Sequence, residues 1–367
     1  MMELLFWLLL VPNAIIFCVV FYNYLTAPRL KNDKTSSEKS SEHISILIPA
    51  RNEEQNIASC LNHVCCQTHH NLEIIVLDDQ STDKTADIVG AFSQKDSRVK
   101  LIAGTSLPEG WLGKNWACHN LSLKATAEKL LFIDADVKLT EDAVTIALNI
   151  MRKEKANMLS VFPTQLIENL GTRLITPLMN WILLSFLPLR KVFTSPSQSF
   201  TAANGQFILI NRNDYISIGG HEKVKAKVVE DMELARAIKQ YGKKIITLVG
   251  DSTVDCKMYS NYADAYNGFS KNFFLGFNMN YVVFFFVLLL LHVVFLLPFV
   301  LVFINAEFVL VILLVLASRV LIALISKQKI VLEVILHPIQ MIILLIVGIN
   351  SLIVTRKKKA EWKGRII

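Results

Sequence analysis

Two aspartates, Asp134 and Asp136, follow an apolar stretch at residues 129–133 that has the composition of a buried strand. If the strand persists through them, residues two apart share one face, and the two carboxylates point at the same place. Two like charges that close are unfavourable unless a cation or a proton neutralises one of them. A hard divalent metal shared with a diphosphate satisfies that requirement. Taken alone, the pair is equally compatible with two solvated loop acids, because short acidic patterns are common.

Strand-like runs occur at residues 44–49, 72–77, 99–102, 129–133, 158–162 and 202–210, the last of which begins with a glycine turn. The first three alternate with helical patterns, which is typical of a parallel sheet covered by helices. In such sheets, ligands bind beyond the carboxyl ends of the strands. Arg51 follows the first strand, and Asp78 and Asp79 follow the second, so we expect them in one crevice with Asp134 and Asp136.

Apolar residues at helical spacing predict helices over residues 57–64, 85–92 and 141–153. Asn52 is expected to cap the first of these helices, with acidic residues in its first turn.

A glycine-flanked lysine, Lys114, lies in the stretch 110–118 and is expected to open a helix. A helix N-terminus with an added point charge suits a phosphate group. A solvated lysine on a surface loop explains the same pattern without a ligand. A second acidic pair, Glu230 and Asp231, stands at a predicted helix start, where the helix dipole by itself favours acids.

The chain has 367 residues, of which 53% are hydrophobic, and its mean hydropathy of +0.42 is high for a soluble protein. The excess is confined to two segments, roughly residues 3–27 and 281–354. Each contains runs close to the ~20 residues that cross a bilayer. Because the composition between them is that of a soluble protein, the sequence predicts a globular domain tethered to a membrane.

The N-terminal apolar run, residues 4–25, is long for a signal peptide and has no basic segment before it, so we expect a retained anchor. Arg29, Lys31 and Lys34 follow it, which predicts a cytoplasmic location for the globular domain. The formal net charge of +7 suits an anionic membrane surface or an anionic substrate. Nucleic acid is not expected as a partner, because the sequence lacks the arginine and aromatic pattern of a binding module.

Three further candidate spans are residues 281–304, 306–325 and 330–354. The pair His337-Pro338 is expected to break the last of them. Three crossings would leave the basic residues 356–359 outside, against the positive-inside tendency. Either the last segment is re-entrant or one segment is not a full crossing, and a cytoplasmic tail is favoured.

Residues 174–189 hold an apolar run that is too short to span a bilayer. The run is compatible with a core helix or with an interfacial helix that Trp181 anchors. Arg190 and Lys191 follow it directly and favour the interface.

Five motifs in order give the sequence a family resemblance. They are Pro49–Glu54, Gln67–Asp83, Gly113–Asn120, Asp134–Asp136 and Glu230–Asp231. With these motifs the chain resembles the inverting family-two glycosyltransferases, whose GT-A fold is a Rossmann-like α/β domain for nucleoside-diphosphate sugars. One departure is Gln80, where the family usually has glycine.

The stretches 110–118 and 361–365 are similar to the membrane-bound branch that glycosylates polyisoprenoid-type lipids. The resemblance implies transfer of a hexose from UDP-glucose to a carotenoid acid such as 4,4'-diaponeurosporenoate. The alternatives are a hopanoid, a glycerolipid or another polyisoprenoid as acceptor, or a polysaccharide synthase. The Gln-x-x-Arg-Trp motif of synthases is missing from residues 266–272. A membrane scaffold or transporter that contains an α/β domain is the non-enzymatic alternative.

The resemblance also assigns roles to single residues. Glu53 and Asp79 would hold the base and ribose of the UDP-sugar, with Asp134 assisting. Asp136 would ligate Mg²⁺ or Mn²⁺ on the diphosphate, and Asp231 would be the general base. The donor site as a whole is assigned to Pro49, Ala50, Glu53, Asp79, Lys114 and Asp134.

The implied organisation is an α/β GT-A domain with transmembrane helices at both ends. The expected boundaries are 1–27 for an N-terminal anchor, 28–42 for a linker, 43–272 for the GT-A domain, 273–355 for C-terminal transmembrane helices and 356–367 for a basic tail. The expected setting is the cell membrane, with several crossings and a cytoplasmic catalytic domain. A nucleotide-sugar donor and a lipid acceptor are the expected partners, and association with other enzymes of carotenoid synthesis is left open.

Overall fold

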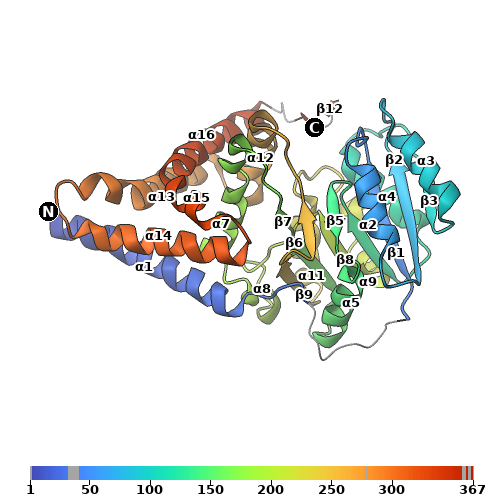
Figure 1. The fold of residues 1–367 in the computed structure, drawn as a ribbon, viewed down its shortest axis with the longest axis horizontal. Helices are drawn as coiled ribbons and strands as arrows, with labels where there is room; N and C mark the ends of the chain where they lie inside the picture. Colours follow the sequence, from blue (N-terminus) through green and yellow to red (C-terminus); the bar gives the residue numbers. More distant parts are fainter. Residues whose placement is uncertain (1, 32–40, 278, 358–360, 363–364, 367) are drawn as a thin grey trace.

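The computed structural model describes residues 2–31, 41–277, 279–357, 361–362 and 365–366. It is an elongated molecule with an α/β domain at one end and long apolar helices at the other (Figure 1). The α/β domain is built on a seven-stranded sheet of order β3-β2-β1-β4-β8-β6-β9. Its strands are β1 (Ile44–Ala50), β2 (Leu72–Asp78), β3 (Val99–Ala103), β4 (Lys129–Ile133), β6 (Met158–Phe162), β8 (Phe207–Asn211) and β9 (Ile245–Val249).

The sheet is mixed rather than wholly parallel. Strands β3, β2, β1 and β4 are parallel neighbours, as the sequence predicts, whereas β8 pairs antiparallel with both β4 and β6. The carboxyl ends of β1, β2 and β4 therefore lie side by side, and the amino end of β8 joins them, with Phe207 opposite Ile133. The turn that precedes β8 is thereby placed at the edge where ligands of such sheets bind.

The two aspartates after β4 do not continue that strand, so the condition under which they would share one face of a strand is not met. The chain turns at Asp134–Asp136, where the Val137 amide donates to the Asp134 carbonyl at 3.2 Å. It then enters a small second sheet of order β5-β10-β7. The strands of that sheet are β5 (Val137–Leu139), β7 (Thr164–Gln165) and β10 (Val254–Cys256).

Helices cover both faces of the main sheet. They are α2 (Ile57–Cys65), α3 (Thr85–Lys95), α4 (Gly113–Lys124), α5 (Ala143–Lys153), α9 (Arg212–Ser217), α10 (Gly220–Lys223) and α11 (Glu230–Gln240). Successive side chains of β1 enter two different cores, Leu47 in one and Ile46 and Ile48 in the other. A strand buried on both faces needs a continuous apolar run, which is why β1 is so easily recognised in the sequence.

The expected helices are confirmed to within a few residues, but the expected cap at Asn52 is wrong. Helix α2 begins at Ile57, with Asn56 as its N-cap residue. Asn52 instead adopts a left-handed backbone with φ 51°, and its side-chain oxygen accepts from the Thr82 amide at 2.9 Å. It joins the loop after β1 to the loop after β2.

Four helices are long and apolar enough to cross a membrane among the described residues. They are α1 (Met2–Thr26), α13 (Tyr281–Leu301), α14 (Phe308–Ile325) and α16 (His337–Arg356). A short helix, α15 (Ile330–Ile335), precedes α16, so the predicted break at His337-Pro338 is confirmed.

A layer of shorter helices joins the apolar end to the α/β domain. It consists of α6 (Leu170–Arg173), α7 (Pro177–Phe186), α8 (Arg190–Thr194) and α12 (Tyr262–Phe277). Trp181 of α7 is 1% exposed and packs edge-to-face on Phe295 at 4.9 Å between ring centroids. The expectation that Trp181 anchors an interfacial helix is therefore wrong, because its ring is enclosed by protein.

Part of the expected linker is ordered. Leu30 donates its amide to the Val249 carbonyl at 2.8 Å, and the Val249 amide donates to the Pro28 carbonyl at 2.9 Å. Residues 32–40 of the linker and residues 358–360, 363–364 and 367 of the expected tail lie outside the described residues. The expected domain boundary at residue 272 falls inside α12.

A buried carboxylate on β2 ties the parallel strands together. Glu73 accepts hydrogen bonds from Ser45 at 2.6 Å, from the Thr126 amide at 2.7 Å and hydroxyl at 2.8 Å, and from Lys100 at 2.9 Å. Burial by itself would raise the pKa of Glu73, but these hydrogen bonds outweigh it and lower the pKa to about 2.

We expect Glu73→Gln to destabilise the detergent-solubilised protein at pH 7 by about 1–3 kcal/mol, because buried donors lose their acceptor. A lowered carboxyl pKa contributes stability above the ordinary value of 4.5 and loses it as pH falls through about 2. The difference in melting temperature between wild type and variant should therefore shrink between pH 5 and pH 3. Glu109→Gln, on an exposed loop, is the matched control, and an equal loss in both variants would refute the role of Glu73.

Candidate functional site

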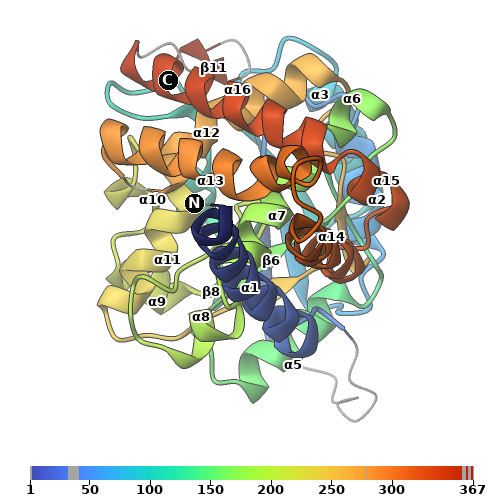
Figure 2. The same cartoon turned by 90° about the vertical axis from the view of Figure 1, so that its left-hand side faces the viewer.

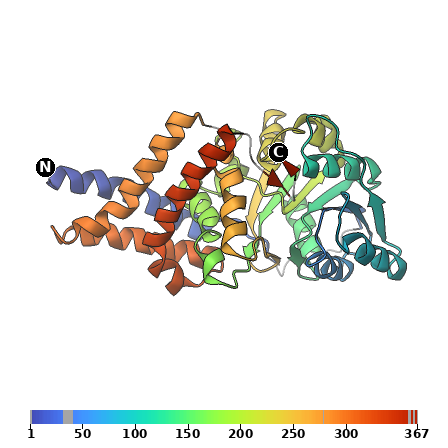
Figure 3. The same ribbon diagram turned by 90° about the horizontal axis from the view of Figure 1, so that it is seen from above.

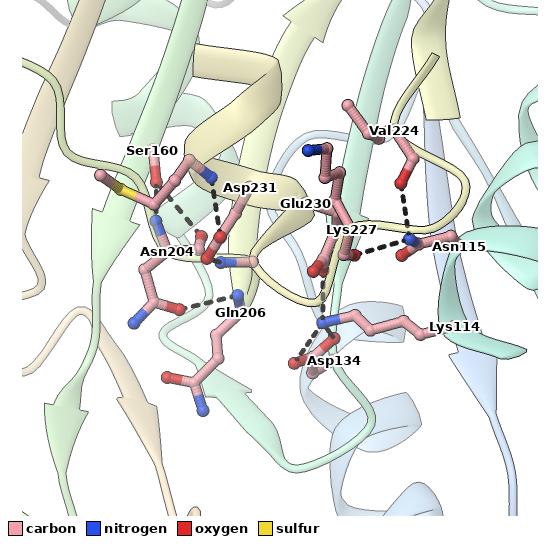
Figure 4. Close-up of polar contacts among 12 residues, drawn as sticks. Lys114, Asn115, Asp134, Ser160, Asn204, Gln206, Val224, Lys227, Glu230 and Asp231 are labelled. Carbon is pink, nitrogen blue, oxygen red and sulfur yellow. Dashed lines mark hydrogen bonds and ion pairs between the residues drawn. The ribbon is translucent and has the colours of Figure 1, made fainter. Parts of the chain in front are cut away.

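The ammonium group of Lys114 lies between two carboxylates at the edge of the sheet (Figure 4). It is 2.7 Å from Asp134 Oδ1 and 3.4 Å from Glu230 Oε1. The three residues come from the first turn of α4, the turn after β4 and the start of α11. Burial would lower the pKa of Lys114, but Asp134 and Glu230 raise it well above its ordinary value. The site therefore keeps a fixed positive charge.

Gly205 packs directly against this ion-pair group. A Cβ atom on Gly205 would lie 3.1 Å from Lys114 Nζ and 3.2 Å from Glu230 Oε1, so the position suits only glycine without rearrangement. The Gly205 amide donates to Asp231 Oδ2 at 2.8 Å, and the Met232 amide donates to Asp231 Oδ1 at 2.7 Å. The turn before β8 thus brings the side chains of Asp231 and Lys114 to the same glycine, Gly205. The sequence analysis did not foresee this arrangement.

The carboxyl group of Asp231 has a pKa above the ordinary value of an aspartate. Burial and the neighbouring Glu230 raise its pKa, Lys114 and the two amide hydrogen bonds oppose them, and the result is about 7. A carboxylate with a pKa near the working pH is suited to accept and release a proton.

Asn204 shapes the turn that holds Gly205. Its amide donates to Ser160 Oγ at 2.8 Å, and its side-chain oxygen accepts from the Gln206 amide at 2.9 Å (Figure 4). Gln206 in turn donates its side-chain amide to Cys256 Sγ at 2.7 Å. These buried polar residues were missed from the sequence, where residues 202–210 gave only a glycine turn leading into a strand.

Asp136 follows Asp134 in the turn after β4, and its side chain lies beside Cys256 of β10 in the small sheet. Its Oδ1 atom is buried and has no hydrogen-bond partner within the described part of the chain. Burial, and then the charges of Asp134 and Glu53, raise its pKa to about 7, while the Cys256 thiol beside it has a small opposing effect. An unsatisfied buried carboxylate oxygen is one that a proton or a cation can stabilise.

A divalent cation fits Asp136 if a ligand contributes the remaining oxygens. The described residues contain no group of three or more histidine, cysteine, aspartate or glutamate side chains that could hold a metal by themselves. Mg²⁺ is commonly held by one or two carboxylates together with substrate phosphates, and Asp136 next to Asp134 meets that pattern.

The loops after β1 and β2 are joined by hydrogen bonds at the same edge. Arg51 donates to the Asp79 carbonyl at 2.5 Å, and the Asp79 amide donates to the Ala50 carbonyl at 2.7 Å. The Glu53 amide donates to Thr85 Oγ1 at 2.8 Å, and the Glu53 carboxylate accepts from Asn56 at 2.9 Å. Pro49 and Ala50 end β1, so the sequence-predicted donor residues other than Lys114, which lies in α4, are at the ends of three adjacent strands or in the loops that follow.

Gln80, the position where the resemblance calls for glycine, has φ 57°. This left-handed backbone is the conformation that glycine adopts most easily, and another residue there costs roughly 1–2 kcal/mol. The turn after Asp79 therefore keeps its shape despite the substitution.

Two further residues, to which the sequence analysis gave no role of their own, lie near the site. Asn115 donates its side-chain amide to the carbonyls of Val224, Lys225 and Lys227, at 2.9, 3.1 and 2.9 Å, which fixes the segment before α11 (Figure 4). Lys271 of α12 is largely buried, which lowers its pKa, while the nearby Glu230 raises it. For Asn115, the only signal in the sequence was its place inside the motif that begins at Gly113.

Three comparisons place this geometry among known proteins. Residues 45–215 match the family model described as Glycosyl transferase family 2. The chain is 26% identical over 251 residues to 4,4'-diaponeurosporenoate glycosyltransferase of Staphylococcus haemolyticus (strain JCSC1435), covering 67% of this chain and 65% of that protein. It is 28% identical over 240 residues to the protein of the same name from Staphylococcus aureus (strain USA300), covering 64% and 61%. The matches thus span less than two thirds of these relatives.

A solved structure of similar fold is the mannosyltransferase PcManGT from Pyrobaculum calidifontis in complex with GDP-Man and Mn²⁺. The TM-score is 0.56 at 15% identity, over 95% of this chain and 99% of that chain. At that identity the likeness establishes the fold alone, and the predicted GT-A fold is confirmed.

We expect Gly205→Ala to destabilise the protein by about 1–3 kcal/mol, since the added methyl group pushes Lys114 away from Glu230. Gly90→Ala in α3 is the matched control, because nothing lies within 4 Å of its added Cβ, and it should leave the melting temperature unchanged or raise it. Thermal unfolding of both purified variants measures the difference. Equal stability of the two would mean that Gly205 is not a tight contact.

Proposed function

We propose that this chain transfers a hexose from a nucleoside-diphosphate sugar to an apolar acid in the membrane, and the match of residues 45–215 to the glycosyl transferase family 2 model supports this proposal. UDP-glucose is the proposed donor, and a carotenoid acid such as 4,4'-diaponeurosporenoate is the proposed acceptor. The names of the curated relatives support the acceptor, and the four apolar helices support a reaction at a membrane.

The observation that carries this proposal is the arrangement of charge around Lys114. Lys114 pairs with Asp134 and Glu230, while the half-buried Asp136 and Asp231 have pKa values raised to about 7. Asp136 is then available to a cation, and Asp231 is available to a proton. Transfer of a sugar from a diphosphate to a nucleophile needs both.

We assign the donor diphosphate to Lys114 and Asp136, with Asp134 oriented by its ion pair to Lys114. Mg²⁺ or Mn²⁺ bound by Asp136 would stabilise the negative charge that develops on the leaving diphosphate. The nucleoside is assigned to the joined loops after β1 and β2, where Glu53 and Asp79 would hold base and ribose.

We assign the acceptor side to Asp231. For a hydroxyl acceptor, Asp231 takes the proton as the oxygen attacks C1 from the face opposite the diphosphate, which inverts that centre. A carboxylic acid acceptor is already ionised at neutral pH, so for it Asp231 contributes orientation rather than proton transfer.

We place the catalytic domain, proposed as residues 43–272, at the cytoplasmic face of the cell membrane. Arg29 and Lys31 follow α1 directly, and Lys327 and Lys329 follow α14. Such flanking cations favour the cytoplasmic side.

We expect UDP to bind the wild-type protein more tightly with Mn²⁺ than without it, and Asp136→Ala to lose that dependence, because the cation loses its protein ligand. Isothermal titration of the detergent-solubilised protein with and without Mn²⁺ measures the difference. Asp96→Ala, before β3 at the opposite edge of the sheet, is the matched control and should keep the metal effect. Metal-independent binding by the wild type would argue for a scaffold or transporter instead.

We expect membranes that contain the protein to add one hexose mass to a carotenoid acid when they are supplied with UDP-glucose. Asp231→Asn should slow transfer to a hydroxyl acceptor by about 10²–10⁴-fold and transfer to a carboxylic acid by much less. The rate with a hydroxyl acceptor should rise with pH through about 7, as Asp231 loses its proton. Mass spectrometry of the lipid extract measures the product, and long glycan as the only product would replace the proposal with a polysaccharide synthase.

A further inference from the structure

Helix α16 carries a stripe of exposed isoleucines along one side. Its members are Ile339, Ile342, Ile346, Ile349 and Ile353, each 38% to 51% exposed. Their spacing of three and four residues keeps them on one face of the helix. The opposite face is buried against protein and includes Gln340, Leu344, Val347 and Ser351.

Both ends of α16 contact the layer of helices next to the α/β domain. Near the start, Gln340 donates its side-chain amide to the carbonyl of Arg173 in α6 at 2.9 Å. Near the end, Ser351 Oγ accepts from the amide of Phe274 in α12 at 2.9 Å. The residues between these contacts make about 16 Å of helix. A helix that crossed the membrane would carry its far end away from that layer.

The long helices α1 and α14, in contrast, end together at the α/β domain. Arg29, after α1, lies 3.4 Å from Asp251, and Lys327, after α14, lies 3.1 Å from the same carboxylate. Both helices run along the long axis of the molecule, whereas α16 and α12 run across it (Figures 1 and 3). Viewed from the end that carries the N-terminus, α16 lies across the molecule in front of the α/β domain (Figure 2).

A buried polar cluster fixes the depth, along the membrane normal, at which α15 and α16 begin. Glu333 of α15 pairs with Arg319 of α14 at 3.3 Å and with Arg173 at 3.2 Å, and Gln340 also contacts Arg319. From Arg319 to Ile325, at the end of α14, is about 9 Å of helix. Interfacial helices lie about 5–10 Å into the boundary between headgroups and acyl chains, so α15 returns to that depth.

We propose that α16 lies in the plane of the membrane surface on the side of the catalytic domain, and that only α1, α13 and α14 cross. The isoleucine stripe is then covered by lipid acyl chains. The charges agree with this topology, because basic residues follow α1, α14 and α16, whereas the loop 302–307 between α13 and α14 has none.

Lipid is the occupant of the stripe because the stripe continues the exposed apolar surface of the crossing helices. Leu290 and Val293 of α13 and Leu310 and Leu313 of α14 are also exposed. Backbone groups of α16 are satisfied within the helix, as an element in contact with lipid requires. With α16 at the surface, Lys357 at its end lies on the same side of the membrane as Lys329 and the catalytic domain.

The geometry also brings the candidate site close to lipid. Helix α12 lies between α16 and the α/β domain (Figures 1 and 3). Phe273 and Phe274 of α12 pack on Phe284 of α13, while Lys271 of the same helix lies near the charges of Glu230 and Asp134. If the proposed function holds, α12 is therefore the helix that separates an apolar acceptor in the membrane from the candidate site.

Labelling of single cysteines in intact and permeabilised cells tests the topology. Lys357→Cys, Lys329→Cys and Ala306→Cys are made in a background in which Cys18, Cys65 and Cys66 are serine and Cys60, Cys118 and Cys256 stay buried. We expect a membrane-impermeant maleimide to label Lys357→Cys and Lys329→Cys under the same condition, intact or permeabilised cells. Ala306→Cys should show the opposite pattern. If Lys357→Cys labels together with Ala306→Cys, α16 crosses the membrane and the proposal is overturned. This result does not depend on transferase activity.

Depth measurements in proteoliposomes test what covers the stripe. A fluorophore attached through Ile346→Cys should be quenched more by a lipid nitroxide near the headgroup than by one near the acyl terminus. Ile304→Cys, exposed beyond the end of α13, marks the far surface of the bilayer. Stronger quenching by the deep nitroxide, quenching by aqueous iodide alone, or efficient disulfide formation between two copies through Ile346→Cys would each overturn the proposal.

Discussion

Compensation of negative charge by one half-buried ammonium group is the constraint on which the candidate site depends. Lys114 pairs with both Asp134 and Glu230, which would otherwise repel each other and the two aspartates beside them more strongly. It does not neutralise Asp136 or Asp231, whose pKa values burial and neighbouring charge raise to about 7. One lysine thus separates four clustered carboxylates into two that are fixed as ion pairs and two that remain able to gain a proton or a cation.

This arrangement requires parts of the chain that are far apart in sequence to meet within a few ångströms. The sheet brings the ends of β1, β2 and β4 together, and antiparallel β8 adds the turn that contains Gly205. Because Gly205 has no side chain, Asp231 and Lys114 can both approach its backbone. Asn115 and Asn204 then fix the neighbouring segments through buried hydrogen bonds, which limits how far these charges can move.

The junction with the apolar helices depends on charge in a similar way. Asp251 accepts ion pairs from the ends of α1 and α14, and Glu333 joins α15 to both α14 and α6. The Glu333 pairs are buried and costly to break from one side, because the remaining charge has no water to solvate it. The Asp251 pairs, whose cations are partly exposed, join the ends of α1 and α14 to the α/β domain. Helix α12 lies between the candidate site and the apolar surface.

The sequence by itself determined the elements and the residue types of the candidate site. Continuous apolar runs revealed β1, β2 and β4, motif order revealed a family resemblance, and helical hydrophobicity revealed the long apolar helices, because each of these signals is local. Only the tertiary structure decided that β8 runs antiparallel, that Trp181 is enclosed by protein, and that Lys114 pairs with Glu230. It also decided that α16, apolar enough to cross, is hydrogen-bonded near its two ends to α6 and α12. These outcomes depend on contacts between residues more than seventy positions apart, which no local pattern of hydrophobicity or charge records.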